Sequence, residues 1–128
     1  IPGAKKLVEV AHSYGVKVVY HSCGSIVEAI PFLIEAGVDI IHPIQALAAG
    51  MDPQNLKDKF EGQVSFCGGV DTQELLPNGT PEQVAAKVKE LRTIFPTGLI
   101  ISPSHEGLQD DVPPQNIKAM FDEVNKIY

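Results

Sequence analysis

The sequence predicts an α/β fold in which four parallel strands alternate with helices, and two observations support this prediction. Short apolar runs rich in β-branched residues recur between longer segments whose apolar residues follow helical spacing. A glycine precedes each apolar run, and glycine can end a helix in the left-handed conformation without steric cost. These junction glycines are Gly15, Gly37, Gly62 and Gly98. The 128 residues suffice for one hydrophobic core, so we expect a single domain over residues 1–128.

Five segments carry the periodicity or the start signals of helices. They are residues 4–14, 26–36 and 53–60, the segment that begins at Thr80, and the segment that follows residues 113–114. Asp52 is suited to cap the third helix, because its side chain can accept hydrogen bonds from the first turn. Thr80 and Gln83 have the spacing of a capping box at the start of the fourth helix.

Four apolar runs between these helices are continuous rather than alternating, as expected for strands buried on both faces of a parallel sheet. They cover residues 16–20, 38–44, 64–67 and 99–101. Four such units are about half of a (β/α)8 barrel, which typically needs ~250 residues, but the pattern equally allows a small open sheet. The strand-to-helix loops are the longer ones and hold most of the unusual polar residues. Because ligands bind at the carboxyl ends of parallel strands, this asymmetry indicates an α/β enzyme.

Composition excludes several classes of partner. The formal net charge of -6 argues against nucleic acid or an anionic membrane, because both need a basic surface. No apolar run approaches the ~20 residues of a membrane-spanning helix. Two cysteines do not make a disulfide framework, so we expect a cytoplasmic protein whose thiols are free for packing, metal or chemistry.

Residues capable of chemistry follow the ends of all four predicted strands. In chain order they are His21 and Cys23, then His42 and Gln45, then Cys67, Gly68, Gly69 and Asp71, and finally His105 and Glu106. His21 and Cys23 are two positions apart, so both side chains can face one site. Imidazole and thiolate ligands suit zinc, and His105 would complete a set of three with one position open for substrate. The sequence therefore predicts a catalytic zinc site at this end of the sheet.

Each of these residues also has a simpler structural interpretation. A lone cysteine is often a small buried hydrophobic residue, and this applies most to Cys67. His42 precedes a proline and fits a hydrogen-bonded histidine at a strand end. Gly68 and Gly69 allow close backbone approach but lack the spacing of a nucleotide-binding fingerprint.

Several strings resemble the superfamily of uroporphyrinogen decarboxylase and the cobalamin-dependent methyltransferases. They are HSCGSI at 21–26, IEAGVD at 34–39, GGVDTQ at 68–73, PSH at 103–105 and VPPQNI at 112–117. The similarity covers nearly the whole chain in the expected order. The resemblance implies a (β/α)8 or TIM barrel of more than twice this length. This chain would be its C-terminal half, with the N-terminal half absent.

The methyltransferase branch of this superfamily implies a zinc-dependent reaction with a corrinoid protein as partner. There a His-x-Cys-Gly segment and a later cysteine hold zinc, which activates a thiol or similar acceptor while a methyl group moves to or from the corrinoid. His21 and Cys23 match the first two ligands, and His105 stands in place of the third, with Glu106 and Cys67 as alternatives. We expect His105 and Asp71 to act in catalysis. The expected contacts to a small-molecule substrate come from His42, Gln45, Gly68, Gly69 and Asp71.

Two alternatives remain open. The decarboxylase branch needs no metal, and a histidine of the last loop contacts the porphyrinogen, a role that His105 would fill. Its other working residues lie in the absent half, and its pattern usually lacks a cysteine at the position of Cys23, which favours the methyltransferase branch. The second alternative is that this chain by itself is inactive. Half a barrel exposes two sheet edges and much of its core, so we expect self-association or pairing with the N-terminal half.

Overall fold

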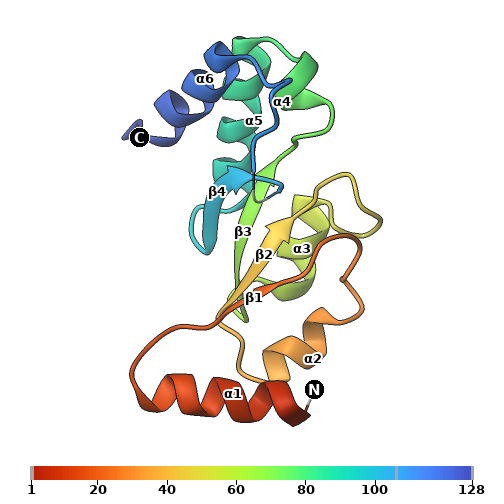
Figure 1. Ribbon diagram of the computed structural model, residues 1–128, viewed down its shortest axis with the longest axis vertical. Coiled ribbons are helices and arrows are strands. Elements are labelled where there is room, and N and C mark those ends of the chain that lie inside the picture. The colour runs from red at the N-terminus through yellow and green to blue at the C-terminus, as the bar shows by residue number, and fades with distance from the viewer. Residues whose placement is uncertain (1, 106, 128) are drawn as a thin grey trace.

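The computed structural model describes residues 2–105 and 107–127, and Figure 1 shows their arrangement. The helices are α1 (Pro2–Ser13), α2 (Ile30–Glu35), α3 (Pro53–Phe60), α4 (Leu75–Asn78), α5 (Pro81–Ile94) and α6 (Pro114–Val124). The strands are β1 (Val19–His21), β2 (Ile40–Ile44), β3 (Ser65–Val70) and β4 (Leu99–Pro103). No helix within the described ranges has the length and apolar character needed to cross a membrane.

The four strands form one sheet in the order β1-β2-β3-β4, and every neighbouring pair is parallel. Strand order therefore equals chain order, with at least one helix between successive strands, which is the repeating unit of a (β/α) barrel. The predicted alternation of parallel strands and helices is confirmed. Because all four strands run the same way, their carboxyl ends and the loops that follow lie at one edge of the sheet.

Local signals place the best-defined helices. The Asp52 carboxylate accepts hydrogen bonds from the backbone N–H groups of Gln54 and Asn55, at 3.0 and 3.1 Å, and α3 occupies the predicted residues. Thr80 and Gln83 form both bonds of the capping box at the start of α5. The four junction glycines have φ of 73°, 90°, 75° and 81°. Gly15, Gly37 and Gly62 lie two residues after the ends of α1, α2 and α3, as the predicted helix-ending role requires, whereas Gly98 lies four residues after α5 ends and leads directly into β4.

Other boundaries differ from the predicted ones. The chain enters α2 through a turn at residues 26–29 and becomes helical only at Ile30, with Pro31 in the first turn. Proline tolerates that position because its missing N–H would have had no helical partner there. β1 begins at Val19 instead of residue 16, and β3 and β4 extend to Val70 and Pro103. The short helix α4 was not predicted.

The core lies between the helices and one face of the sheet, in two clusters. One cluster packs α1, α2 and α3 against the buried side chains of Ile41, Ile44 and Phe66, and the other packs α4, α5 and α6 against Val70. Leu99 contacts both clusters. In Figure 1, α1 and α2 correspondingly lie at one end of the molecule and α4, α5 and α6 at the other.

The second face of the sheet is open to solvent over much of its area. The strand registers place Val19, Ile40, Cys67 and Ile100 on this face. Val19 and Ile100 expose 55% and 53% of their surface. The prediction that the strands are buried on both faces is therefore wrong for this face. Apolar composition marks a strand for burial, but burial also requires a covering layer.

Candidate metal and substrate site

An imidazole and a thiol meet at the carboxyl end of β1. His21 is the last residue of the strand, and Cys23 follows two positions later. The Sγ of Cys23 lies 3.6 Å from Nε2 of His21. On the other side of the ring, Nδ1 of His21 lies 2.9 Å from Nδ1 of His42, which is its register partner on β2. The predicted convergence of His21 and Cys23 is thus present in the structure.

The spacing of this pair fits two ligands of one zinc ion. Zinc binds nitrogen at about 2.0–2.1 Å and sulfur at about 2.3 Å, and a tetrahedral angle then separates the two donors by about 3.5 Å. The observed Nε2–Sγ separation is 3.6 Å. Both side chains are exposed, so an ion and a substrate have access to them. Donor type, spacing and access therefore agree.

Gln45 links the loop that follows β1 to the loop that follows β4. Its Oε1 accepts a hydrogen bond from the backbone N–H of Gly24, and its Nε2 lies 2.7 Å from Nε2 of His105. Because a backbone N–H can only donate, the amide oxygen must face Gly24 and the amide NH2 must face His105. His105 accordingly accepts a hydrogen bond from Gln45. The Gln45 side chain thus bridges the turn after Cys23 and His105.

His105 is held at this edge by the sheet as well. The backbone N–H of Ser104 donates to the carbonyl of Val70 at 2.8 Å, which extends the β3–β4 ladder to the residue before His105. The predicted third ligand nevertheless does not close a preformed cluster. Across residues 2–105 and 107–127, no three His, Cys, Asp or Glu side chains are arranged to hold a metal. Glu106, the alternative ligand, lies outside the described residues.

The end of β3 holds the remaining predicted residues, and packing accounts for three of them. The Sγ of Cys67 lies 3.4 Å from the Ser102 hydroxyl on β4. Gly68 has a φ of 125°, and a Cβ there would lie 2.6 Å from the backbone nitrogen of Ile44, so a side chain would force the strands apart. A Cβ at Gly69 would press on the Leu91 side chain at 3.1 Å. Close approach of backbone and helix therefore requires both glycines.

The Asp71 carboxylate is directed at the backbone of the turn that leads into α4. It accepts hydrogen bonds from the N–H groups of Gln73, Glu74 and Leu75, at 3.2, 2.7 and 2.9 Å. Asp71 and Gly69 also line a cavity of about 500 Å³ whose other walls come mostly from α3, α4 and α5 and the residues beside them. This capping role was not predicted, because the helix α4 that follows the turn was not predicted either.

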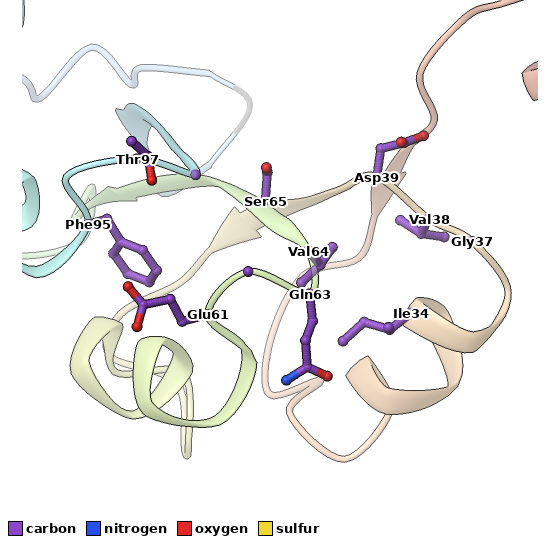
Figure 2. A pocket seen from close by; sticks show the side chains of 12 residues that line it. Ile34, Gly37, Val38, Asp39, Glu61, Gln63, Val64, Ser65, Phe95 and Thr97 are labelled. Atoms are coloured by element: carbon purple, nitrogen blue, oxygen red, sulfur yellow. The ribbon is translucent and has the colours of Figure 1, made fainter.

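A second cavity, of about 570 Å³, lies at the opposite edge, by the amino ends of the strands (Figure 2). Asp39 lies on its rim and contacts two basic side chains from the N-terminal part of the chain. The carboxylate is 2.7 Å from Nε2 of His12 and 2.9 Å from Nζ of Lys17, and it accepts from the Val18 N–H at 2.8 Å. In (β/α) enzymes this edge serves stability, whereas the carboxyl edge serves chemistry. His12, which the sequence left without a role, is thus a structural partner.

These contacts lower the pKa of Asp39. The hydrogen bond from His12 contributes most, followed by the Val18 N–H and the Lys17 ammonium, and together they hold the pKa of the carboxyl well below its usual range. A carboxylate with several donors is favoured in its charged form. Asp39 is therefore ionised in the folded protein at every physiological pH.

Comparisons with known proteins agree with the fold. The model of the uroporphyrinogen decarboxylase (URO-D) family matches residues 1–127. Over 122 residues the chain is 29% identical to a methylcobamide:CoM methyltransferase of Methanosarcina acetivorans, covering 95% of this chain and 34% of that protein. A solved methyltransferase from Methanosarcina mazei shares the fold, with a TM-score of 0.72 at 18% identity, over 94% of this chain and 34% of that one.

The chain thus spans about a third of the length of both relatives. The family match extends over nearly every residue, and the solved relative repeats the parallel-strand architecture. We conclude that this chain belongs to the uroporphyrinogen decarboxylase (URO-D) family.

Proposed function

We propose that this chain carries the zinc site of a methyltransferase that moves a methyl group between a small substrate and a corrinoid protein. The observation that carries the proposal is the 3.6 Å separation of His21 Nε2 and Cys23 Sγ, which matches two ligands of a tetrahedral zinc ion. The relative from Methanosarcina acetivorans supports the reaction class, because its name pairs methylcobamide with CoM.

His21 and Cys23 supply two ligands in this proposal, and His105 supplies the third. Bound zinc would lower the pKa of a coordinated thiol and so provide a nucleophile for methyl transfer near neutral pH. Gln45 orients His105 through its amide NH2, which lies 2.7 Å from the ring. The Nε2 lone pair of His105 already accepts a hydrogen bond from Gln45. The His105 ring must therefore rotate away from this contact before a ring nitrogen can bind the ion.

The small substrate is proposed to bind beside this pair, at the carboxyl ends of β2 and β3. Support comes from His42 and Gln45, which lie at the same edge of the sheet as His21 and the loop of Cys23. Oδ1 of Asp71 accepts one backbone hydrogen bond, from Gln73, and can accept a second one from a substrate. His42, Gln45 and Gly68 complete the proposed substrate contacts, with His105 and Asp71 in the catalytic roles.

We expect the 128-residue chain alone to be inactive. The open sheet face and the limited coverage of the relatives mean that much of a barrel pocket would come from outside this chain. In this proposal the chain contributes the zinc ligands. The surface that binds the corrinoid protein and the rest of the substrate pocket come from residues outside this chain.

A metal-free decarboxylase of porphyrinogen acetate groups is the second candidate. The observation that favours it is the contact between Gln45 and His105. An imidazole that accepts a hydrogen bond from Gln45 at one nitrogen keeps its other nitrogen for a substrate carboxylate or a transferred proton. Tight binding of coproporphyrinogen by a metal-free protein would support this candidate.

Metal analysis of three proteins tests the proposal. Zinc content is measured by plasma mass spectrometry after reconstitution of the wild type, Cys23→Ala and the control Cys67→Ala. We expect near-stoichiometric zinc in the wild type and in Cys67→Ala, and its loss in Cys23→Ala, because only Cys23 lies beside His21. Zinc retained in Cys23→Ala would place the site elsewhere. A zinc-free wild type would overturn the proposed site.

A further inference from the structure

We infer that His42 is a positioning residue for the zinc ligand His21, holding its ring so that Nε2 faces Cys23. This inference rests on the proposed zinc site and adds a residue that is not itself a ligand. It also gives His42 a different role from the substrate contact expected of it.

The geometry of the two rings carries the inference. His21 and His42 are register partners on neighbouring strands, so their side chains emerge on the same face of the sheet. Their Nδ1 atoms are 2.9 Å apart, and the rings are tilted by 47° with centroids 5.0 Å apart, which is an edge contact rather than a stack. The backbone N–H of Ser22 donates to the His42 carbonyl at 2.9 Å, which fixes the two strands up to this point.

The number of protons decides which ring donates. If both rings are neutral, each carries one N–H, and the short contact between the two Nδ1 atoms needs one of these protons between them. If His21 is to bind a metal through Nε2, that nitrogen must keep its lone pair, so the proton of His21 must lie on Nδ1. His42 then accepts with Nδ1 and carries its own proton on Nε2.

The same arrangement serves Cys23. The Nε2 lone pair of His21 lies 3.6 Å from the Cys23 sulfur, so the thiol can donate to it in the absence of metal. Zinc would take the place of the thiol proton between Sγ of Cys23 and Nε2 of His21, whose separation already suits two zinc ligands. Ligating histidines commonly donate their second ring nitrogen to a fixed acceptor, which orients the ring and raises its basicity. Here a second histidine on the adjacent strand is that acceptor.

The opposite arrangement, in which His42 donates to His21, predicts a different tautomer of His21. If His42 donated, His21 would carry its proton on Nε2, with an N–H pointing at the sulfur and no lone pair for a metal. The two arrangements therefore differ in the tautomer of His21 before any metal is added. That difference can be measured without activity and without zinc.

The first arm of the test is the ring tautomer in zinc-free protein. Two-bond ¹H–¹⁵N correlation spectra of the wild type, with assignment by His21→Gln and His42→Asn, report which nitrogen of each ring is protonated. We expect the proton of His21 on Nδ1 and that of His42 on Nε2. A proton of His21 on Nε2 would overturn the inference even if zinc binds.

The second arm is zinc affinity by competition with a chromophoric chelator. His42→Phe removes the acceptor, and we expect zinc binding to weaken by about 10–100-fold. His42→Asn places an amide oxygen near the position of Nδ1 and should recover part of the affinity. The control His12→Asn changes a histidine at the opposite edge of the sheet and should leave affinity unchanged.

The outcomes separate this inference from the proposed function. Wild-type zinc binding that is equal in His42→Phe would overturn the role of His42 alone. No zinc binding by the wild type, together with an Nδ1 proton on His21, would overturn the proposed function while the predicted ring orientation stood. Circular dichroism of each variant shows whether it is folded, and the wild-type spectrum does not depend on any variant folding.

Discussion

At the scale of single residues, the proposed ligands at the end of β1 have different kinds of support. His21 lies within the strand and contacts His42 on the neighbouring strand, so the sheet itself fixes its position. Cys23 lies in the following loop, whose Gly24 N–H is held by Gln45. Strands hold functional groups more precisely than loops do. We therefore expect zinc binding to order the Cys23 loop more than it moves His21.

The ion pairs of Asp39 predict a pH dependence of stability. Asp39→Asn removes the contacts with His12 and Lys17, and we expect the free energy of unfolding to fall by about 1 kcal/mol at neutral pH. Because the folded-state pKa is depressed, this stabilisation is present above pH ~4, the ordinary pKa of aspartate, and is lost as pH falls toward the folded-state value. Urea unfolding of both proteins at pH 7 and pH 3 measures the difference.

A matched control separates this effect from a general loss of charge. Asp122→Asn removes an exposed helical pair with Lys118, which contributes about 0.3–0.5 kcal/mol at most. The Asp39→Asn deficit should shrink between pH 7 and pH 3, since the wild type loses its own contribution there. A deficit that is as large at pH 3 as at pH 7 would show that Asp39 acts by packing rather than by charge.

At the scale of elements, a buried side chain on α6 fastens the C-terminal helix to α4. The amide of Asn116 is 1% exposed and donates to the carbonyls of Leu76 and Gly79, at 2.9 and 2.8 Å. Those carbonyls end the short helix α4, so the contact replaces helical hydrogen bonds that the chain cannot continue. One residue therefore joins two helices that are 40 positions apart.

Asn116→Ala leaves both carbonyls without their donor. We expect the free energy of unfolding to fall by about 2 kcal/mol, because the variant has buried unsatisfied carbonyls and a small void. Thermal and urea unfolding of the variant provide the measurement. Asn55→Ala is the control, because the Asn55 amide makes a single bond to the Gly50 carbonyl at 2.7 Å near the surface. Equal losses in the two variants would argue against a fastening role for Asn116.

At the scale of the whole molecule, the open sheet face predicts self-association of the isolated chain. Val19 and Ile100 are apolar and more than half exposed on a sheet whose edges are β1 and β4. Exposed apolar faces and unpaired strand edges favour contact with other chains. We expect light scattering with size-exclusion chromatography to show oligomers whose share grows with protein concentration.

Substitution of that face should reverse the association. Val19→Thr with Ile100→Thr keeps β-branched side chains, which suit strands, while lowering apolar area. The control Phe121→Gln changes a residue on α6 that is also 53% exposed but lies away from the sheet. We expect the double variant to shift toward monomer and the control to behave as the wild type. A monodisperse wild-type monomer at all concentrations would refute the prediction.

Local signals in the sequence predicted much of the fold because they act over a few residues. Asp52 and the Thr80–Gln83 capping box each satisfy N–H groups within one turn, so their helices begin where the sequence indicates. The spacing of His21 and Cys23 similarly predicted their convergence, since residues two positions apart in extended backbone point the same way. The family match over residues 1–127 agrees with the resemblance drawn from the motifs.

The sequence by itself thus determined the order of strands and helices, the edge that carries the candidate site and the family of the chain. Only the tertiary structure decided that Gln45 spans two loops, that His42 meets His21 and that His12 binds Asp39. The physical reason is range. Caps and periodicity involve neighbours in the chain, whereas these contacts join residues whose closeness exists only after the strands have paired.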